Sequence, residues 1–151
     1  MMHLSDLLKK ETILLSLDAK NREECIDKMV ESMVEAGFVA DKSVYMEAVM
    51  SREETGTTGI GFGVAIPHGK SKGVAEPGLA FARLKQPIDW KSMDGNPVSV
   101  VFLIAVPEEK VGNEHLQILI AISRKLIHEE FRNQLKEAGS AQDIIDILQA
   151  I

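Results

Sequence analysis

The chain has 151 residues, of which 45% are hydrophobic and 26% charged, and this composition is ordinary for one compact domain with a single core. Its 17 Lys and Arg against 23 Asp and Glu give a formal net charge of -6, so repulsion from phosphate backbones argues against a nucleic-acid partner. The longest apolar run, 98–106, is far shorter than the roughly 20 residues of a membrane-spanning helix, so we expect no direct membrane insertion.

Two features of the chain predict a cytoplasmic protein. The N-terminus lacks the apolar core and the small-residue cleavage site of a secretory signal. The single cysteine, Cys25, cannot form an internal disulfide, and its place on the apolar stripe of an expected helix indicates a buried small hydrophobe.

The first third of the chain predicts one strand and three helices. The segment 21–36 carries apolar residues at helical spacing and is followed by Gly37, which is typical of a left-handed helix end. Asp41 is a good N-cap for a further helix that ends near residue 52 or 54. Ahead of these helices we expect a short opening helix at 4–8 and a strand at 12–17.

A glycine-rich loop, 55–63, leads into the run Val64-Ala65-Ile66-Pro67-His68-Gly69. Four closely spaced glycines favour tight bends over helix. The apolar residues predict a short buried strand, and Pro67 is expected to end its pairing because proline lacks a backbone N–H. His68 would then be displayed at the end of this strand, and Gly69 would allow a close approach to the backbone, for example by a phosphoryl group.

The second half of the chain alternates strands with helices. The expected elements are strands at 79–84 and 98–106, a turn-rich link at 94–97, a helix from Asn113 through Ile127 and a last amphipathic helix from about Ala141. The strand at 98–106 is so continuously apolar that we expect it to be central and covered on both faces. The sequence therefore predicts an α/β fold, with a single domain over 1–151 and a mixed parallel/antiparallel sheet of about five strands flanked by helices.

Common nucleotide and nucleophile motifs fail on spacing. The glycines of the 55–63 loop never satisfy Gly-x-Gly-x-x-Gly, and the run Gly69-Lys70-Ser71 lacks the first glycine of a P-loop because position 64 is Val. Neither a Gly-x-Ser-x-Gly elbow nor clustered Cys and His residues occur, which argues against a hydrolase and a structural zinc site.

Two histidines and an arginine remain as candidates for chemistry. His115 would lie in the first turn of a helix, where backbone N–H groups favour an anion. If the loops before His68 and His115 meet at one end of the sheet, two imidazoles converge on an oxyanion, with Arg52 as the cation. Each residue also has a structural alternative, since Pro-His-Gly suits a turn, a polar residue suits an exposed first turn, and an arginine suits a helix C-terminus.

The segment from Glu53 to Gly69 resembles the active-site signature of enzyme IIA of the fructose/mannitol type (type 2) of the phosphoenolpyruvate-dependent sugar phosphotransferase system. The signature residues are Thr57-Thr58-Gly59-Ile60-Gly61 and Val64-Ala65-Ile66-Pro67-His68-Gly69. Further segments fall in family order, namely Pro77-Gly78-Leu79-Ala80, Ile88-Asp89-Trp90, Asp94-Gly95, the stretch 102–107 and Asn113-Glu114-His115-Leu116. The resemblance covers nearly the whole chain and implies a mixed sheet flanked by helices.

The resemblance implies a phosphoryl relay without metal or other cofactor. His68 would accept the group from the phosphocarrier protein HPr, and a cysteine of an enzyme IIB component, on a separate chain that works with a membrane IIC component, would receive it for uptake of a fructose-like sugar. His115 would be the second active-site histidine and Arg52 the arginine beside it. The phosphorylated atom in the family is Nε2, so a local acceptor is expected to hold Nδ1–H. Candidate phosphate contacts are Thr57, Thr58 and Gly69.

Two alternatives stay open beside this relay. In the nitrogen-related branch of the family, phosphorylation of the same histidine would control protein partners and no sugar would be delivered. A metal site made by His68 and His115 is disfavoured because no carboxylate or cysteine stands at a ligand spacing. One departure from the family is Phe62, where many members are expected to have a polar residue, and it would alter the contact of this loop with partners.

Overall fold

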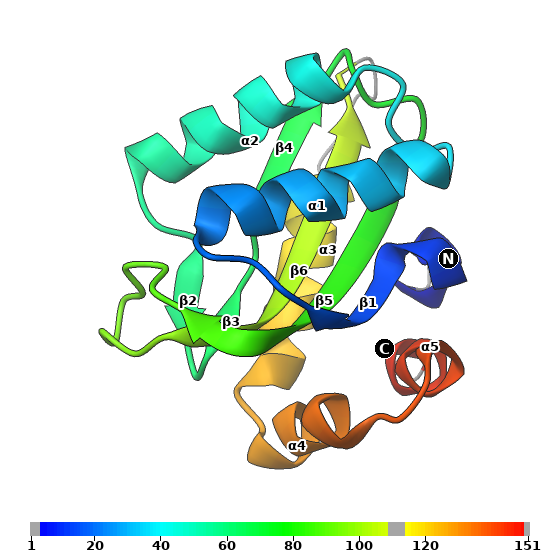
Figure 1. Ribbon diagram of the computed structural model, residues 1–151. Coiled ribbons are helices and arrows are strands. Elements are labelled where there is room, and N and C mark those ends of the chain that lie inside the picture. The colour runs from blue at the N-terminus through cyan, green and yellow to red at the C-terminus, as the bar shows by residue number, and fades with distance from the viewer. Residues whose placement is uncertain (1–3, 109–113, 150–151) are drawn as a thin grey trace.

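A computed structural model describes residues 4–108 and 114–149, with no side chains described for 114–116. Figure 1 shows the order of the elements along the chain. Their bounds are η1 Leu4–Leu7, η2 Lys10–Thr12, β1 Ile13–Leu17, α1 Arg22–Glu35, α2 Lys42–Thr55, β2 Gly59–Gly61, β3 Val64–Ala65, β4 His68–Ser71, β5 Gly78–Ile88, β6 Val98–Pro107, α3 Glu114–Leu126, α4 Glu129–Glu137 and α5 Ala141–Gln149. Over these two described ranges, no helix is both long and apolar enough to cross a bilayer.

The strands form one mixed sheet, as expected, with six strands instead of about five. The order is β1-β5-β6-β3-β2, and β4 also pairs with β6. β1 runs parallel to β5, β3 and β4 run parallel to β6, and the β5–β6 and β2–β3 pairs are antiparallel. β6 is buried along its whole length apart from Ser99, which confirms the prediction of a central strand covered on both faces.

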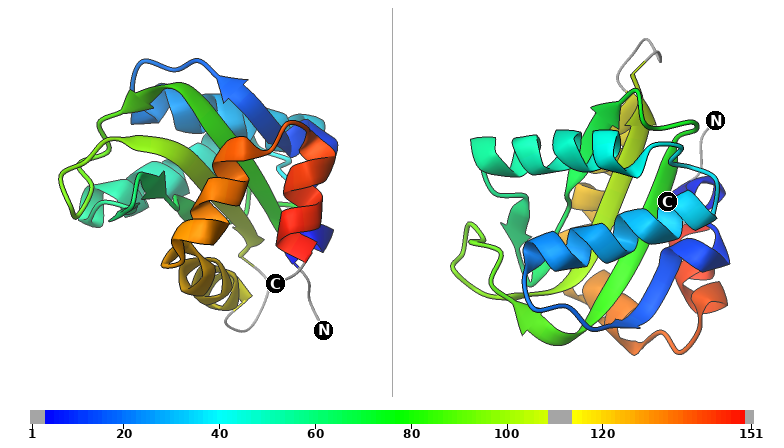
Figure 2. Two further views of the ribbon diagram at one scale, coloured as in Figure 1. Left: turned by 90° about the horizontal axis from the view of Figure 1, so that it is seen from below. Right: turned by 45° about the horizontal axis from the view of Figure 1, so that its top comes forward.

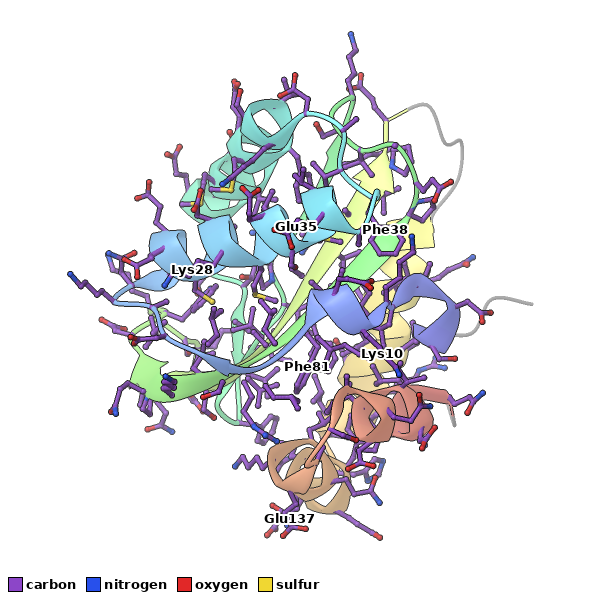
Figure 3. The ribbon with its side chains drawn as sticks, turned by 45° about the vertical axis from the view of Figure 1, so that its right-hand side comes forward. Lys10, Lys28, Glu35, Phe38, Phe81 and Glu137 are labelled. Carbon is purple, nitrogen blue, oxygen red and sulfur yellow. The ribbon has the colours of Figure 1, made fainter. Side chains whose placement is uncertain are left out.

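Alternate residues of the two longest strands separate two hydrophobic cores, because successive side chains of a strand point to opposite faces. Ala80 and Leu103 belong to the core under α1 and α2, whereas Phe81 and Phe102 belong to the core under α3, α4 and α5. Figure 2 shows the sheet between these two helical layers. In Figure 3, Phe81 lies on the α5 side of the sheet.

The ends of the first two long helices agree with the sequence-based expectations. Asn21 and Asp41 accept hydrogen bonds from the backbone N–H groups of Glu24 and Val44, as N-caps do. Gly37 has a φ of 87°, which places it in the left-handed region expected after α1. Burial raises the pKa of the Cys25 thiol to about 12, as suits a small hydrophobe of the α1 core.

Two local predictions were wrong, and one helix was not predicted. The loop 55–63 contains β2, because the hairpin with β3 gives its glycines pairing partners that composition does not show. The third long helix ends at Leu126, so Ile127 lies outside it and is 63% exposed. The sequence also gave no indication of α4, whose buried stripe consists of only Phe131 and Leu135. Asn113, where the third long helix was expected to begin, lies outside the described residues.

Arg83 of β5 joins the sheet to the C-terminal helices. Its Nη1 lies 2.6 to 3.2 Å from the carbonyl oxygens of Leu135, Lys136 and Ala138, and its Nε donates to the carbonyl of Leu15 at 3.2 Å. The last carbonyls of a helix have no partner within the helix, and a cation there also interacts favourably with the helix dipole. Arg83 therefore fixes the C-terminal end of α4 against β1 and β5.

Replacing Arg83 by Met should lower the free energy of unfolding by about 2 kcal/mol, because hydrogen bonds from a charged donor contribute about 1.5 to 3 kcal/mol. Urea denaturation followed by circular dichroism measures the change. Lys85→Met is the control, since Lys85 lies on the same strand and is exposed. Equal stability of the two variants would contradict the role given to Arg83.

Candidate functional site

β3 ends at Ala65, just before Pro67, as the sequence had suggested. The pairing does not stop there, however, because His68 is the first residue of a further strand, β4. Ala65 of β3 pairs with Val101 of β6 and His68 pairs with Ile104, so the pairing resumes in the same register three residues later. Pro67 interrupts the ladder only locally, because its carbonyl still accepts from the N–H of Ile104 at 3.1 Å. The strand segments before and after the interruption are therefore both paired with β6, and this pairing fixes the backbone of His68.

The register also gives the direction of the His68 side chain. Partners across a parallel pair point to the same face of the sheet, and Ile104 belongs to the core under α3. Hence His68 lies on the α3 face. His115 is the second residue of α3, so the fold brings the histidine and the first turn of that helix to the same side of the sheet. The side chain of His115 lies outside the described part of the chain.

The imidazole of His68 is held by the backbone two residues earlier. Its Nδ1 lies 3.0 Å from the carbonyl oxygen of Ile66. A carbonyl oxygen only accepts, so Nδ1 carries the proton and the lone pair of the neutral ring is on Nε2. This contact is the local acceptor for Nδ1–H that the family resemblance implied.

Gly69 allows a close approach to the backbone of β4, and helix α2 makes this approach. A Cβ at position 69 would lie 3.1 Å from Cγ2 of Val49, 3.3 Å from Cε1 of Tyr45 and 3.3 Å from the backbone N of Val49. The hydroxyl of Tyr45 donates to the carbonyl of Ile104 at 2.6 Å, and burial raises its pKa well above the ordinary tyrosine value. Helix α2 thus rests directly on β4 and β6 beside His68.

Arg52 lies in the last turn of α2, where the sequence placed it. Its Nη1 donates to the carbonyl oxygen of Gly56 at 2.7 Å, and the residue is half-buried. This contact satisfies a carbonyl just beyond the helix end and draws the glycine loop toward α2. The guanidinium has five N–H donors, so this single bond leaves most of its donor capacity for other groups.

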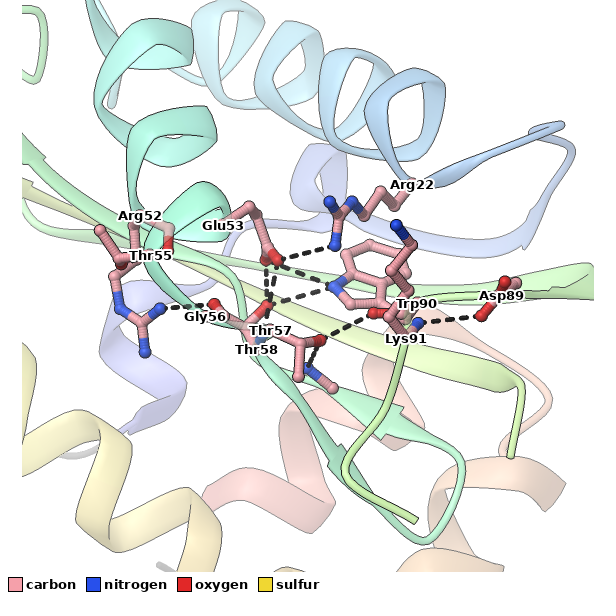
Figure 4. Close-up of polar contacts among 11 residues, drawn as sticks. Arg22, Arg52, Glu53, Thr55, Gly56, Thr57, Thr58, Asp89, Trp90 and Lys91 are labelled. Carbon is pink, nitrogen blue, oxygen red and sulfur yellow. Dashed lines mark hydrogen bonds and ion pairs between the residues drawn. The ribbon is translucent and has the colours of Figure 1, made fainter. Parts of the chain in front are cut away.

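The start of the glycine loop is fixed by a buried polar network around Glu53 (Figure 4). The Glu53 carboxylate accepts from the hydroxyl of Thr58 and, at 3.3 Å, from Nε1 of Trp90, and it lies 3.5 Å from Nη1 of Arg22. Thr57 donates to the carbonyl of Trp90 at 2.7 Å and accepts from the N–H of Gly59 at 3.0 Å. Both threonine hydroxyls therefore hold the loop in place.

Glu53 opens the signature segment and Trp90 lies in a further matching segment, but sequence reasoning gave neither residue a role in this site. Tyr45, Val49 and Glu53 are spaced i, i+4 and i+8, which puts the carboxylate on the buried stripe of α2. Glu53 is only 3% exposed. That spacing was the available signal, because a carboxylate on a buried helical stripe needs specific partners.

Phe62 lies at the tip of the β2–β3 hairpin with a φ of 60°, in the left-handed region. It is 50% exposed, and the guanidinium of Arg132 stacks 4.4 Å from its ring centroid. Its N–H donates to Asp94, whose pKa is lowered by the backbone N–H of Asn96 first and by that of Phe62 second. An exposed aromatic ring thus stands at the position where many members of the family are expected to have a polar residue.

Within the described residues, no group of three or more His, Cys, Asp or Glu side chains is arranged to hold a metal ion.

The family model for the phosphoenolpyruvate-dependent sugar phosphotransferase system, EIIA 2, matches residues 6–151. The chain belongs to this family. It is 44% identical over 147 residues to the fructose-specific EIIABC component of Bacillus subtilis, covering 97% of this chain but 23% of that protein. It is 40% identical to the fructose-specific EIIA component of Haloferax volcanii, covering 98% and 96% of the two chains. Enzyme IIA components are phosphotransferase phosphoryl carriers.

Members of both functional branches are similar to this enzyme IIA chain. A nitrogen regulatory protein of Bradyrhizobium diazoefficiens is 37% identical, covering 97% of this chain and 95% of that one. The crystal structure of the nitrogen regulatory protein IIA-Ntr from Neisseria meningitidis superposes with a TM-score of 0.83 at 29% identity, covering 95% and 97% of the chains. The mannitol enzyme IIA of Escherichia coli, solved in complex with phosphorylated enzyme IIB, gives 0.80 at 25% identity, covering 95% and 98%.

Gly69→Ala should lower the free energy of unfolding by about 1 to 3 kcal/mol, because the added methyl group overpacks the α2–β4 contact. Gly56→Ala is the matched control, since a Cβ there meets nothing within 4 Å and its φ of 165° is extended. Urea denaturation of both variants measures the difference. A Gly69→Ala variant as stable as the control would show that α2 does not require a glycine at this position.

Proposed function

We propose that this chain is a phosphohistidine carrier that accepts a phosphoryl group from phospho-HPr on Nε2 of His68 and passes it to a cysteine of an enzyme IIB component for uptake of a fructose-like sugar, in the cytoplasm. The observation that carries the proposal is the 3.0 Å contact between Nδ1 of His68 and the carbonyl of Ile66. It leaves the Nε2 lone pair as the nucleophile. The fructose-specific relatives, at 44% and 40% identity, support the sugar class.

The proposed transfer is an in-line displacement at phosphorus. The Nε2 lone pair forms a new P–N bond while the P–N bond to the donor histidine breaks, and the electron pair of that bond returns to the donor ring. In the second step a cysteine thiolate of the enzyme IIB component attacks phosphorus, and the bonding pair returns to His68. Such a reaction leaves little covalent chemistry to the protein, so positioning and charge stabilisation carry it.

Arg52 and His115 are the groups proposed to stabilise the transferring phosphoryl group. Arg52 retains donors beyond its bond to Gly56. His115 lies in the first turn of α3, where a helix N-terminus attracts anions, on the face of the sheet to which His68 points. Backbone N–H groups near Gly69 are further proposed contacts. Thr57 and Thr58 are assigned to the loop network, since their hydroxyls already have partners.

A regulatory role is the second candidate, favoured by the 37% identity to a nitrogen regulatory protein and the TM-score of 0.83 to IIA-Ntr. Phosphorylation of His68 would then change contacts with protein partners, and no phosphoryl group would leave for a sugar. Both candidates require the same nucleophilic nitrogen. They differ only in the fate of the phosphoryl group after His68 has received it.

His68→Gln should abolish acid-labile phosphorylation by phospho-HPr, because glutamine has no nucleophilic ring nitrogen. Labelling with radioactive phosphoenolpyruvate, enzyme I and HPr measures the incorporated phosphate. His128→Gln is the control, since His128 is exposed, precedes α4 and makes no side-chain cap hydrogen bond. Retained labelling of His68→Gln would show that another residue is the acceptor.

Adding a fructose-type enzyme IIB to the phosphorylated protein separates the two candidate functions. A transport carrier should lose its label to the IIB cysteine within the time course of its own phosphorylation. The experiment follows radioactivity on both proteins in acid-free gels. Label that stays on this chain despite an active IIB preparation would favour the regulatory role.

A further inference from the structure

The carboxylate of Glu53 is buried at the end of α2, although burying a charge is unfavourable unless it is paired and hydrogen-bonded. Four groups contact it: the hydroxyl of Thr58, the backbone N–H of Thr58 at 3.4 Å, Nε1 of Trp90 and the guanidinium of Arg22 (Figure 4). Apolar residues of similar volume often give equal or greater stability than a buried ion pair. A satisfied buried network instead restricts its members to one conformation.

A path of hydrogen bonds leads from this network to the imidazole of His68. The Thr58 hydroxyl is held by Glu53 and also accepts from Nε1 of Trp90 at 3.2 Å. The carbonyl of Thr58 accepts from the N–H of Ile66 at 2.9 Å, and the carbonyl of Ile66 faces Nδ1 of His68 at 3.0 Å. Each residue along this path is buried until His68 is reached.

The interruption of the sheet makes Ile66 suitable for this path. Ile66 lies after the end of β3 and before the start of β4. Its carbonyl therefore faces the imidazole, while its N–H is fixed by Thr58. The orientation of the peptide groups of Ile66 thus depends on Thr58, eight residues earlier in the chain, and on the network that holds Thr58 in place.

We propose that Glu53 and Thr58 are positioning residues for His68, acting through Ile66 to hold its neutral imidazole in the Nδ1–H tautomer with the lone pair on Nε2. The importance of this tautomer for transfer rests on the proposed phosphoacceptor role of His68. A histidine without a fixed partner exchanges between two tautomers, and only one of them presents Nε2 as a nucleophile. The network therefore keeps His68 in every molecule in the tautomer whose Nε2 can react.

The test measures the tautomer directly, with long-range ¹H–¹⁵N correlation spectra of the histidine-labelled protein at about pH 8, where imidazole is neutral. The wild-type chain should show the separate Nδ1–H and unprotonated Nε2 shifts of one tautomer for His68. Thr58→Val and Glu53→Met should move both nitrogen shifts toward their common average. Thr58→Ser, which keeps the hydroxyl, should restore the wild-type pattern.

Phosphorylation by phospho-HPr is the second readout. The rate of phosphorylation should fall at least about two-fold in Thr58→Val, because fewer molecules then hold His68 in the Nδ1–H tautomer that can react. The rate should recover in Thr58→Ser. Arg83→Met is the control for stability, since Arg83 contacts α4 and β1 and belongs to neither the network nor the path. It should lose stability without any change in the His68 shifts.

The outcomes separate the positioning role from the proposed function. Unchanged His68 shifts in folded Thr58→Val and Glu53→Met would overturn the positioning role, even if phosphorylation slowed, because a direct phosphate contact would then explain the loss. The opposite result is a change of tautomer in these variants while His68 of the wild-type chain takes up no phosphate from phospho-HPr. This result would overturn the proposed function and leave the positioning role intact.

Discussion

Strand β6 is the constraint on which the rest of the structure depends. It is paired with β5 on one side and with both β3 and β4 on the other, and its alternate residues supply both hydrophobic cores. Because β3 and β4 keep one register against β6, the break between them is confined to Ile66 and Pro67. The break is thereby held at a fixed place, and the carbonyl group that it exposes meets the imidazole of His68.

The two helical layers act on this site in different ways. Helix α2 packs against β4 without a Cβ between them at position 69, and its last turn carries both Arg52 and the buried Glu53. Helix α3 begins on the opposite layer, on the face to which His68 points. The residues proposed for the site therefore come from both helical layers. The glycine-rich loop leads from the end of α2 into β2, and its glycines allow the backbone to turn tightly within a few residues.

The chemistry proposed for the site consists of holding one phosphoryl group at one nitrogen of His68. A neutral imidazole whose Nδ1 faces a carbonyl suits reversible phosphoryl transfer, because Nε2 can act as nucleophile in the first step and as leaving group in the second. The same chemistry serves a transport relay and a regulatory switch equally well. The two proposed functions differ in the partner that the phosphorylated protein meets.

The sequence by itself determined the fold class, the central strand at 98–106, the caps at Asn21 and Asp41, and the candidate histidine, because periodicity, capping and turn chemistry are local. It also gave the family, since the run from Glu53 to Gly69 is long and specific. Only the tertiary structure decided that Pro67 interrupts the sheet without ending it, that α2 occupies the space beside Gly69, and that Glu53, Thr58 and Trp90 share one network. These facts depend on register and on contacts between segments far apart in the chain, which no local pattern encodes.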